Sequence, residues 1–449
     1  MTPLLAFAFS LASCVPMRFP SADPQALARL EGSPVNCILA ERAQWKPEFL
    51  ASAAQRALHP LAVVRSPGES ASLPESGISG VVVEGRLPPE EMKAIRSRWP
   101  VALITARNSL TGQCDAEICG TAEALWAGIR IEQDGAAHAA PTSAPWIDTN
   151  IGFLRFAGAL LSAPLWLAHQ PPPGAAWPAE RYLAAISDAA AGGGAWIVSL
   201  DPDLAKLWLS GDPRAEAIWK RIARHLAFFA KHRQWLRLPP AGRLAVIQDE
   251  TSGALLSAGL LDMIGSRHTP VRIVPPARIS PERLQGARIA INVEPSSLSD
   301  SARQGLRQFA ASGGRVVSNP DDFRFPKGDG YVLSLDKLPK AELDRFEFLW
   351  RSLLATTRGE NLGVRLFNVA SILSSLVSDP ATGRTYLLLV NYADHTAENV
   401  TMYVPGKPNA ARLYTPEAPP RALESYSVEE GTAFDLEQFQ SAAIIEFEP

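Results

Sequence analysis

Short apolar runs alternate with amphipathic segments through the first half of the chain. Seven runs are rich in β-branched or apolar residues and have the length of buried strands: 35–40, 61–65, 80–84, 101–105, 126–131, 164–169 and 195–200. Helical periodicity lies between several of them, at 47–58, 88–99, 149–161 and 179–190. This alternation is typical of βα units around a parallel sheet, so we expect a (β/α)8-type barrel over residues 30–238.

The pattern changes twice in the second half of the chain. After Pro239-Pro240, strands at 243–248, 271–274, 287–293 and 315–318 alternate with helices around 253–264 and 299–311, which predicts a doubly wound, flavodoxin-like α/β domain over 239–335. Residues 361–449 instead contain short alternating strands between Asp, Gly and Pro turns, at 363–368, 385–391, 399–404, 411–415 and 442–447. This last pattern predicts an antiparallel β-sandwich.

Composition is that of a packed globular protein with several domains. The 449 residues are 47% hydrophobic and 20% charged, with a formal net charge of -3. There is no long basic run, so the sequence has no electrostatic footprint for nucleic acid and little for anionic lipid. A small neutral ligand suits this charge balance better.

The first residues favour export. Residues 1–13 are apolar and end in Leu11-Ala12-Ser13-Cys14, which resembles a bacterial lipoprotein signal over residues 1–14. In this interpretation Cys14 carries a lipid anchor and the protein is periplasmic or at the cell surface. No Lys or Arg precedes the apolar stretch, so an ordinary buried segment is the alternative.

The other three cysteines have structural interpretations. Cys37 lies in an apolar run, where a small core residue is expected. Cys114 and Cys119 flank a short polar loop and are spaced to close a small disulfide ring in an oxidising compartment. Their spacing is not that of a zinc site, so no metal is expected.

The order of the three domains carries a resemblance to a known family. The chain has a predicted barrel, then an α/β unit, then a sandwich; in the α/β unit the helix at 299–311 leads into Gly313-Gly314-Arg315-Val316-Val317. This order resembles that of the three-domain β-galactosidases of glycoside hydrolase family 42. The resemblance implies that the middle domain has an amidotransferase-like fold and serves assembly, which would make the protein a homo-oligomer, with a trimer as the first expectation. No cysteine follows Cys119, so the amidotransferase nucleophile is missing.

The catalytic motifs of that family do not match. The family carries an Asn-Glu pair after the fourth strand and a nucleophilic Glu after the seventh. Counting from the run at 35–40, the fourth strand here leads into Ala106-Arg107-Asn108 and a late one into His169-Gln170-Pro171. Three explanations stay open: the strand count is off by one, the carboxylates are relocated, or the barrel binds without hydrolysing.

Carboxylates at strand ends are the candidates for chemistry, because cleavage of a glycosidic bond needs two carboxyl groups across the sugar. Glu84 ends a buried strand, Asp201 follows the last one, and Asp148 lies beside Trp146 in a polar turn. We predict these three carboxylates as catalytic. Each of the two aspartates has an alternative duty, because either could cap the helix that follows it.

Other side chains near the strand ends are predicted to bind substrate. They combine hydrogen-bonding groups with aromatic faces that stack on sugars: Glu41, Trp146, Trp166, His169 and Gln170. The alternatives are an ion pair of Glu41 with Arg42, core packing of a tryptophan, and a structural loop at His169-Gln170.

Several other chemistries lack their motifs. The sequence has no Walker loop, no G-x-G-x-x-G after a strand, no H-E-x-x-H and no G-x-S-x-G, so it predicts no phosphate, dinucleotide, zinc or serine-hydrolase site and no cofactor. Two functions follow. The protein is a glycoside hydrolase acting through a carboxylate pair at the barrel mouth or, alternatively, a non-catalytic carbohydrate-binding or scaffold lipoprotein with a degenerate barrel.

Overall fold

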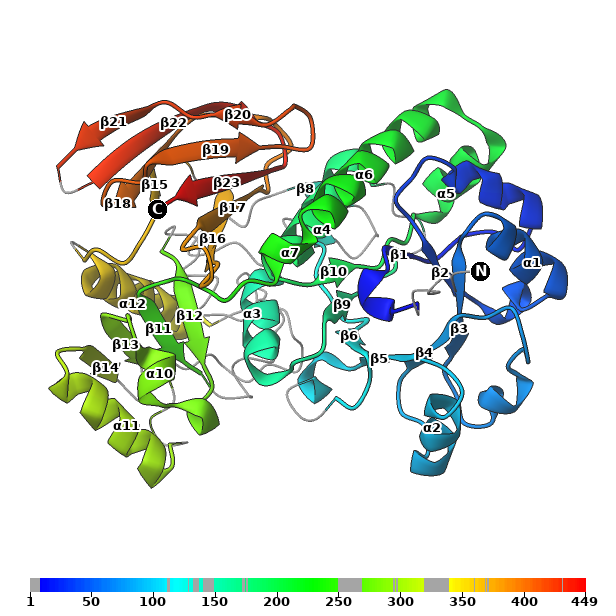
Figure 1. Ribbon diagram of the computed structural model, residues 1–449, viewed down its shortest axis with the longest axis horizontal. Helices are drawn as coiled ribbons and strands as arrows, with labels where there is room; N and C mark the ends of the chain where they lie inside the picture. The colour runs from blue at the N-terminus through cyan, green and yellow to red at the C-terminus, as the bar shows by residue number, and fades with distance from the viewer. Residues whose placement is uncertain are drawn as a thin grey trace, which may run out of the picture. The chain divides into compact units, whose positions relative to one another are not determined.

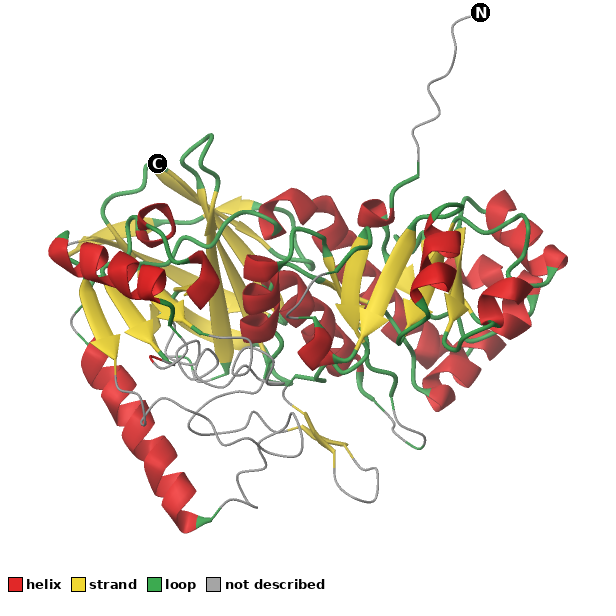
Figure 2. Cartoon of the chain, turned by 90° about the horizontal axis from the view of Figure 1, so that it is seen from below, coloured by secondary structure: helices red, strands yellow, loops and turns green. Residues whose placement is uncertain are grey.

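The computed structural model describes most of the chain. The described residues are 9–110, 114–127, 129–131, 137–139, 149–171, 174, 177–248, 269–293, 295, 298–318, 339–358, 360–367, 369, 371–429 and 431–449. Their contacts divide the chain into two compact units, shown in Figures 1 and 2. The first unit comprises Met1–Ala124, Leu161–Trp177 and Ala195–Ala230, and the second comprises Leu125–Leu160, Pro178–Gly194 and Lys231–Pro449.

The first unit contains a parallel β-barrel. Its eight strands are hydrogen-bonded in the order β1 (Pro16–Met17), β2 (Cys37–Ala40), β3 (His59–Val64), β4 (Gly80–Glu84), β5 (Val101–Thr105), β6 (Ile118–Thr121), β9 (Leu165–Leu167) and β10 (Ala195–Trp196). A bridge between Met17 and Val198 joins the last strand to the first, where Arg18 N–H donates to the Val198 carbonyl at 2.8 Å. The predicted barrel is therefore confirmed.

Alternate residues of these strands fill the barrel. Apolar side chains from successive strands form one buried cluster inside it, which includes Leu39, Val63, Val82, Ile104 and Trp166. The intervening residues face outward and pack with Met92 and Ile95 of α2 (Pro89–Arg96). The other helical segments of this unit are η1 (Leu11–Ser13), η2 (Pro24–Leu30), η3 (Arg42–Gln44), α1 (Pro47–Gln55), η4 (Glu69–Ser72), η5 (Arg107–Ser109), α5 (Pro202–Ser210) and α6 (Pro213–Lys231).

The barrel strands differ from the prediction at three places. Strands β1 and β6 were not predicted, and the predicted strand at 126–131 is wrong, because Ile129–Ile131 forms β7 and pairs antiparallel with β8 (Ala137–Ala139) outside the barrel. Strand β1 has only two residues, and β6 contains Gly120, where a Cβ would meet the backbone of Trp166 on β9. Neither strand has a β-branched run like that of β4, and the run at 80–84 is the fourth strand rather than the third.

Two disulfides fix the first unit. Cys114 is bonded to Cys119, as predicted, and Cys14 is bonded to Cys37. Cys37 is a buried core residue, as predicted, but its bond to Cys14 was not predicted. Cys14 is buried in the same cluster, and its sulfur, to which a lipid anchor would be attached, is in the disulfide.

The second unit begins with two helices, α3 (Ile151–Leu160) and α4 (Ala179–Ala191), followed by α7 (Arg233–Leu236). A parallel sheet follows in the order β12 (Val271–Val274), β11 (Leu244–Ile247), β13 (Ile289–Asn292) and β14 (Arg315–Ser318). Its described helices are η6 (Pro276–Arg278), α10 (Pro281–Leu284), α11 (Asp300–Ala311) and α12 (Lys340–Thr357). Ser299 caps α11 through its side chain, as Ser residues at helix starts commonly do. The order, with β11 central, is that of the predicted doubly wound domain.

The C-terminal part is an antiparallel sandwich, as predicted. One sheet has the order β15 (Arg365–Phe367), β18 (Ala397–Pro405), β22 (Gly431–Phe439) and β21 (Ser425–Val428). The other has the order β16 (Ile372–Ser378), β17 (Thr385–Asn391), β23 (Ala442–Glu448), β19 (Ala410–Tyr414) and β20 (Arg421–Ala422). Leu387, Leu436 and Ile445 belong to the apolar core between them. None of the helices in the described part is long and apolar enough to cross a bilayer.

Candidate functional site

The carboxyl edge of the barrel strands, here called the barrel mouth, is where polar side chains replace the apolar layers. On β2, β3 and β4 the inward positions are Leu39, Val63 and Val82. Because side chains alternate along a strand, the next inward positions are Glu41, Arg65 and Glu84. This is the edge at which barrels of this kind carry their binding and catalytic groups.

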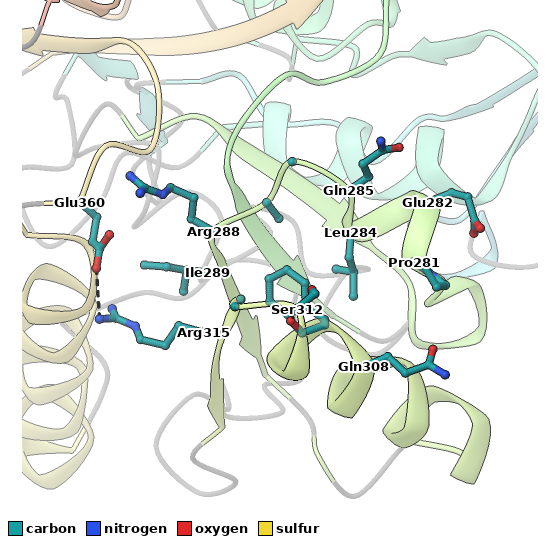
Figure 3. Close-up of a pocket in the computed structure, with 15 residues that line it drawn as sticks. Pro281, Glu282, Leu284, Gln285, Arg288, Ile289, Gln308, Ser312, Arg315 and Glu360 are labelled. Carbon is teal, nitrogen blue, oxygen red and sulfur yellow. Dashed lines mark hydrogen bonds and ion pairs between the residues drawn. The ribbon is translucent and has the colours of Figure 1, made fainter.

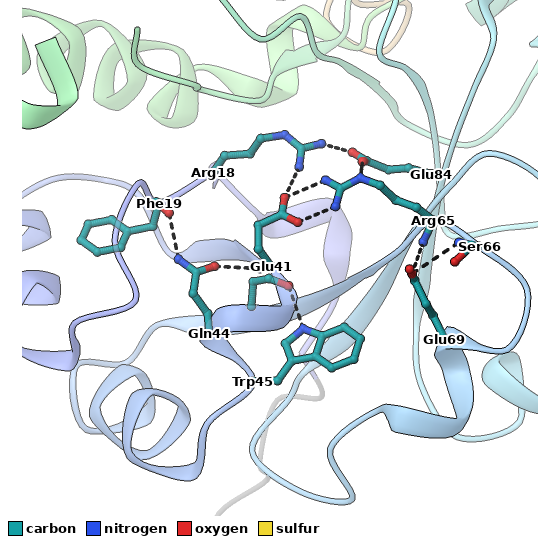
Figure 4. Close-up of polar contacts among 10 residues, drawn as sticks. Arg18, Phe19, Glu41, Gln44, Trp45, Arg65, Ser66, Glu69 and Glu84 are labelled. Carbon is teal, nitrogen blue, oxygen red and sulfur yellow. Dashed lines mark hydrogen bonds and ion pairs between the residues drawn. The ribbon is translucent and has the colours of Figure 1, made fainter. Parts of the chain in front are cut away.

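Hydrogen bonds connect the loops that follow β1 and β2. Glu41 N–H donates to Gln44 Oε1 at 2.7 Å, and Gln44 Nε2 donates to the carbonyls of Phe19 and Ser21, both at 2.8 Å. Trp45 Nε1 donates to the Ala40 carbonyl at 2.9 Å. The buried amide of Gln44 thus holds the two loops in one arrangement (Figure 4).

Four side chains form a closed ion-pair network, which we call the mouth network: Arg18, Glu41, Arg65 and Glu84 (Figure 4). Arg18 Nη1 donates to Glu41 Oε1 at 2.7 Å, and its Nη2 donates to Glu84 Oε1. Arg65 donates from Nη1 and Nη2 to the two oxygens of Glu41, at 2.5 and 2.7 Å, and from Nε to Glu84 Oε2 at 2.8 Å. Each arginine therefore bridges both glutamates.

The network favours the ionised form of Glu41. Burial works to raise the pKa of Glu41, but the hydrogen bonds and charges of Arg65 and Arg18 outweigh it and hold that pKa below its usual value. The hydrogen bond to Glu41 in turn raises the pKa of Arg65, while burial lowers the pKa of Arg18. An ionised Glu41 accepts hydrogen bonds and has no proton to donate.

Two further described carboxylates that follow barrel strands accept backbone N–H groups. Asp201 is buried after β10, and its Oδ1 accepts the Leu204 N–H at 2.9 Å, so it caps α5 as the alternative interpretation expected. Glu123 follows β6, and its Oε2 accepts the Arg107 N–H at 2.7 Å. Glu123 was not predicted as a strand-end carboxylate, because β6 was not predicted as a strand.

The predicted substrate residues are spread between mouth and core. His169 Nδ1 donates to the Ala124 carbonyl at 2.6 Å, which leaves Nε2 as the ring atom for a ligand, and Gln170 is exposed. Trp166 is a correction. It is 2% exposed and belongs to the apolar cluster inside the barrel, so core packing explains it. Trp146 and Asp148 lie outside the described residues.

The corrected strand count changes the comparison with family 42. Glu84 ends β4 and so stands at the fourth-strand position, where the resemblance puts the acid/base residue. The seventh strand is β9, and it leads into Ala168-His169-Gln170, without a carboxylate at the nucleophile position. The chain therefore keeps one expected position and departs at the other.

Two buried polar atoms at the mouth have no hydrogen-bond partner in the described structure: Arg18 Nε and Ser199 Oγ. They belong to residues just after the two strands that close the barrel, where Arg18 N–H donates to the carbonyl of Val198, the residue before Ser199. Both are atoms that a hydroxyl group can satisfy. Among the residues that the structure describes, no three metal-ligating side chains come together.

The α/β domain has a cavity of about 790 Å³ (Figure 3). Its wall includes Ile289 and Arg315, the first residues of β13 and β14, and Arg315 is paired with Glu360 at 3.3 Å. Doubly wound sheets bind ligands at the carboxyl ends of their strands, whereas this cavity lies at the amino ends. The barrel mouth is therefore the better candidate site.

Solved structures resemble the chain along nearly its whole length. An α-L-fucosidase isoenzyme 2 from Paenibacillus thiaminolyticus matches with a TM-score of 0.64 at 11% identity, covering 96% of this chain and 98% of the other. The cold-adapted β-galactosidase from Rahnella sp. R3 matches with a TM-score of 0.53 at 9% identity, covering 95% of each. The chain has a glycoside hydrolase fold.

A catalytic mutant of Gan42B, a GH42 β-galactosidase from G. stearothermophilus, also matches, with a TM-score of 0.44 at 10% identity over 80% of this chain and 65% of the other. No protein-family model and no curated protein sequence matches the chain. The predicted likeness is thus one of fold, and the low identities fit a glycoside-hydrolase-like chain that has diverged.

Proposed function

We propose that the protein binds a neutral carbohydrate at the barrel mouth and does not hydrolyse it. The observation that carries this proposal is the mouth network, in which Arg18 and Arg65 each bridge Glu41 and Glu84.

Hydrolysis would need one protonated and one ionised carboxyl group across the sugar. The general acid of such a pair has a raised pKa, usually because it is buried away from cations. Glu41 is held in the opposite state, and Glu84 accepts hydrogen bonds from two guanidinium groups. Asp201 and Glu123 bond to backbone N–H groups. Each of these four carboxylates thus accepts hydrogen bonds from N–H donors, which is the arrangement of a binding surface.

The same groups suit a ligand with many hydroxyls. A carboxylate oxygen has two acceptor sites, so Glu84 can accept from a sugar hydroxyl while it keeps its arginines. Ser199 Oγ and Arg18 Nε are further buried groups that have no hydrogen-bond partner among the described residues. The network has two positive and two negative charges, which favours a neutral ligand over a charged one.

We also propose that the protein works outside the cytoplasm. All four cysteines are paired in disulfides, which persist in oxidising compartments. This argument needs no lipid on Cys14.

A second candidate is hydrolysis with Glu84 as a catalytic carboxylate. It is favoured by one observation, the place of Glu84 at the end of the fourth strand. In this case a partner carboxylate is needed from elsewhere in the mouth, and Arg18 and Arg65 would act on an ionised Glu84 as positioning residues.

Ligand-induced thermal stabilisation tests the binding proposal. Neutral oligosaccharides of galactose, fucose, glucose, xylose and mannose are each added to the wild type, to Arg65→Gln and to a matched control, Arg96→Gln, whose ion pair with Asp115 lies away from the mouth. The melting temperature of the wild type and of the control should rise with at least one sugar, and that of Arg65→Gln should not. No rise with any sugar, or an equal rise in Arg65→Gln, would overturn the proposal.

A further inference from the structure

The outer face of the four-stranded sheet of the sandwich exposes aromatic side chains. Phe367 on β15 and Tyr426 on β21 are 49% and 46% exposed, the values of residues left in solvent rather than packed. The strand order is β15-β18-β22-β21, so these two rings stand on the two edges of one sheet, shown with its strand labels in Figure 1.

Strand register puts a third ring between them. Tyr403 of β18 is opposite Ala433 of β22, and Ala433 is opposite Tyr426 of β21. Residues directly opposite each other point to the same face of a sheet, so Tyr403 and Tyr426 flank a small residue in one row. They are two strand spacings apart, about 10 Å, a separation comparable to the length of two sugar rings.

The ring of Tyr403 lies over Gly431. A Cβ built on Gly431 would collide with the ring carbons of Tyr403, so this ring covers the backbone of Gly431, its diagonal neighbour on β22. Only glycine leaves room for a ring in that position. The contact fixes the Tyr403 ring beside Ala433, in one row with Tyr426.

A polar row runs beside the aromatic one. Phe367 is opposite Thr401, and Thr401 is opposite Asp435. Asp435 Oδ1 accepts from Thr401 Oγ1 at 2.8 Å and from the Tyr426 hydroxyl at 3.3 Å. These two hydroxyls fix the carboxylate next to the rings, and within the described structure its Oδ2 bonds to no other residue.

We infer that this face binds a neutral polysaccharide chain, independently of the barrel mouth. We call it the sandwich face and define it by Phe367, Thr401, Tyr403, Tyr426 and Asp435. Flat aromatic rings stack on the C–H faces of pyranose rings, and a carboxylate fixed beside them accepts hydrogen bonds from sugar hydroxyls.

The charge of the face decides between a sugar and a protein. The centres of protein interfaces are depleted of charged residues, because an unpaired carboxylate there would lose its water without compensation. Here Asp435 lies opposite Thr401, two residues along β22 from Ala433. Glu437 of the same strand is paired with Arg421 at 3.6 Å, and Arg365 lies opposite Tyr403. A face that carries charges of both signs has no net charge to attract an anionic or a cationic glycan, so a neutral hydroxyl-rich chain is the fitting occupant.

Affinity electrophoresis of the whole protein tests the inference. Native gels contain one soluble neutral polysaccharide each, with galactan, xylan, mannan, xyloglucan and β-glucan as probes. At least one should retard the wild type. Tyr426→Ala and Asp435→Ala should each weaken that retardation by about tenfold in polysaccharide concentration. The control Phe348→Ala removes an equally exposed ring from α12 and should migrate like the wild type.

The outcomes separate this site from the mouth. Tyr426→Ala and Asp435→Ala should keep the sugar-induced rise in melting temperature that Arg65→Gln loses, so a failure at the mouth and a failure at the sandwich face are distinguished by two different measurements. Far-ultraviolet circular dichroism and melting temperature confirm that each variant is folded. Absence of retardation with all five probes, or retardation that Tyr426→Ala and Asp435→Ala leave intact, would overturn the inference. So would self-association of the wild type that Tyr426→Ala abolishes, because the face would then bind a second copy of the chain.

Discussion

Arg65 Nε donates to Oε2 of Glu84 over 2.8 Å, while the other two nitrogens of the same guanidinium donate to Glu41. One arginine thus satisfies two strand-end glutamates at once, and Arg18 repeats the arrangement from the other side. An enzyme that needs a general acid keeps one carboxyl group away from such cations. The arrangement fits a rigid binding surface.

The mouth network should be needed for stability. Glu84→Gln removes a charge that is 13% exposed and leaves Arg18, which is also buried, with one anionic partner fewer. We expect a loss of about 3 kcal/mol in the free energy of unfolding in urea, because one partner of a largely buried ion pair is removed. Asp115→Asn, in the exposed pair with Arg96, should cost less than about 1 kcal/mol. A Glu84→Gln protein at least as stable as the wild type would instead indicate a strained catalytic carboxylate.

The Cys14–Cys37 disulfide should contribute more than the Cys114–Cys119 one. The first bond spans a sequence separation of 23 and the second a separation of 5, and the stabilisation grows with the loop that is closed. The Cys14→Ser, Cys37→Ser double variant should lose about 3 kcal/mol in the free energy of unfolding. The Cys114→Ser, Cys119→Ser variant is the matched comparison and should lose less. Equal losses would contradict the loop-closure argument, and labelling of Cys14 by a thiol reagent in the native protein would show that the bond is absent.

A buried hydrogen-bond network should hold the helices of the second unit to its sandwich. Tyr392 donates from its hydroxyl to Asp188 Oδ1 at 2.6 Å, and the backbone N–H and side-chain amide of Asn150 donate to Asp188 Oδ2 at 2.9 and 2.7 Å. All three residues are fully buried or nearly so. Tyr392→Phe should cost about 2 kcal/mol in the free energy of unfolding, because a hydrogen bond to a charged group is lost. The exposed Tyr426→Phe is the control, and an equal effect of the two changes would contradict this account.

Acid should destabilise the first unit through His225. Burial, with added repulsion from Arg221 and Arg224, lowers the pKa of this side chain to about 3. The unfolded chain has the ordinary value, so it takes up the proton first as the pH falls below about 6.5. The stabilisation is complete above that pH and is lost toward pH 3, by about 1.4 kcal/mol per pH unit. Urea unfolding of the wild type and of His225→Gln between pH 7 and pH 4.5 measures this slope, which should be smaller in the variant. Parallel curves would refute the assignment.

The sequence predicted the fold where strands have long β-branched runs. The bounds of β4 and β5 agree with the prediction residue for residue, because Val81-Val82-Val83 and its neighbour are buried on both faces. It failed at β1, which has two residues, and at β6, where Gly120 allows close contact with β9. The missing β1 shifted the strand count and hid the fourth-strand position of Glu84, whereas the missing β6 hid Glu123.

The site was predicted only in part, for a different reason. Glu41 and Glu84 were predicted because they are carboxylates at strand ends. Arg18 and Arg65 were not predicted, although their hydrogen bonds and charges lower the pKa of Glu41. The inward positions of Glu41, Arg65 and Glu84 follow from the alternation along each strand, but their mutual contacts depend on the closure of the barrel. For Trp166, alternation predicts that the side chain points into the barrel. It does not predict how far below the mouth the ring lies, and the ring lies in the apolar core.

The central claim is that the mouth binds neutral sugar without cleaving it, and product analysis tests this most directly. The wild type and Glu84→Gln are incubated at equimolar concentration with each oligosaccharide that raises the melting temperature and with aryl α-L-fucoside and aryl β-galactoside, and products are separated by anion-exchange chromatography. We predict intact oligosaccharides and no released aryl group with either protein. Products formed by the wild type and lost in Glu84→Gln, with the variant folded, would contradict the claim and establish hydrolysis through Glu84.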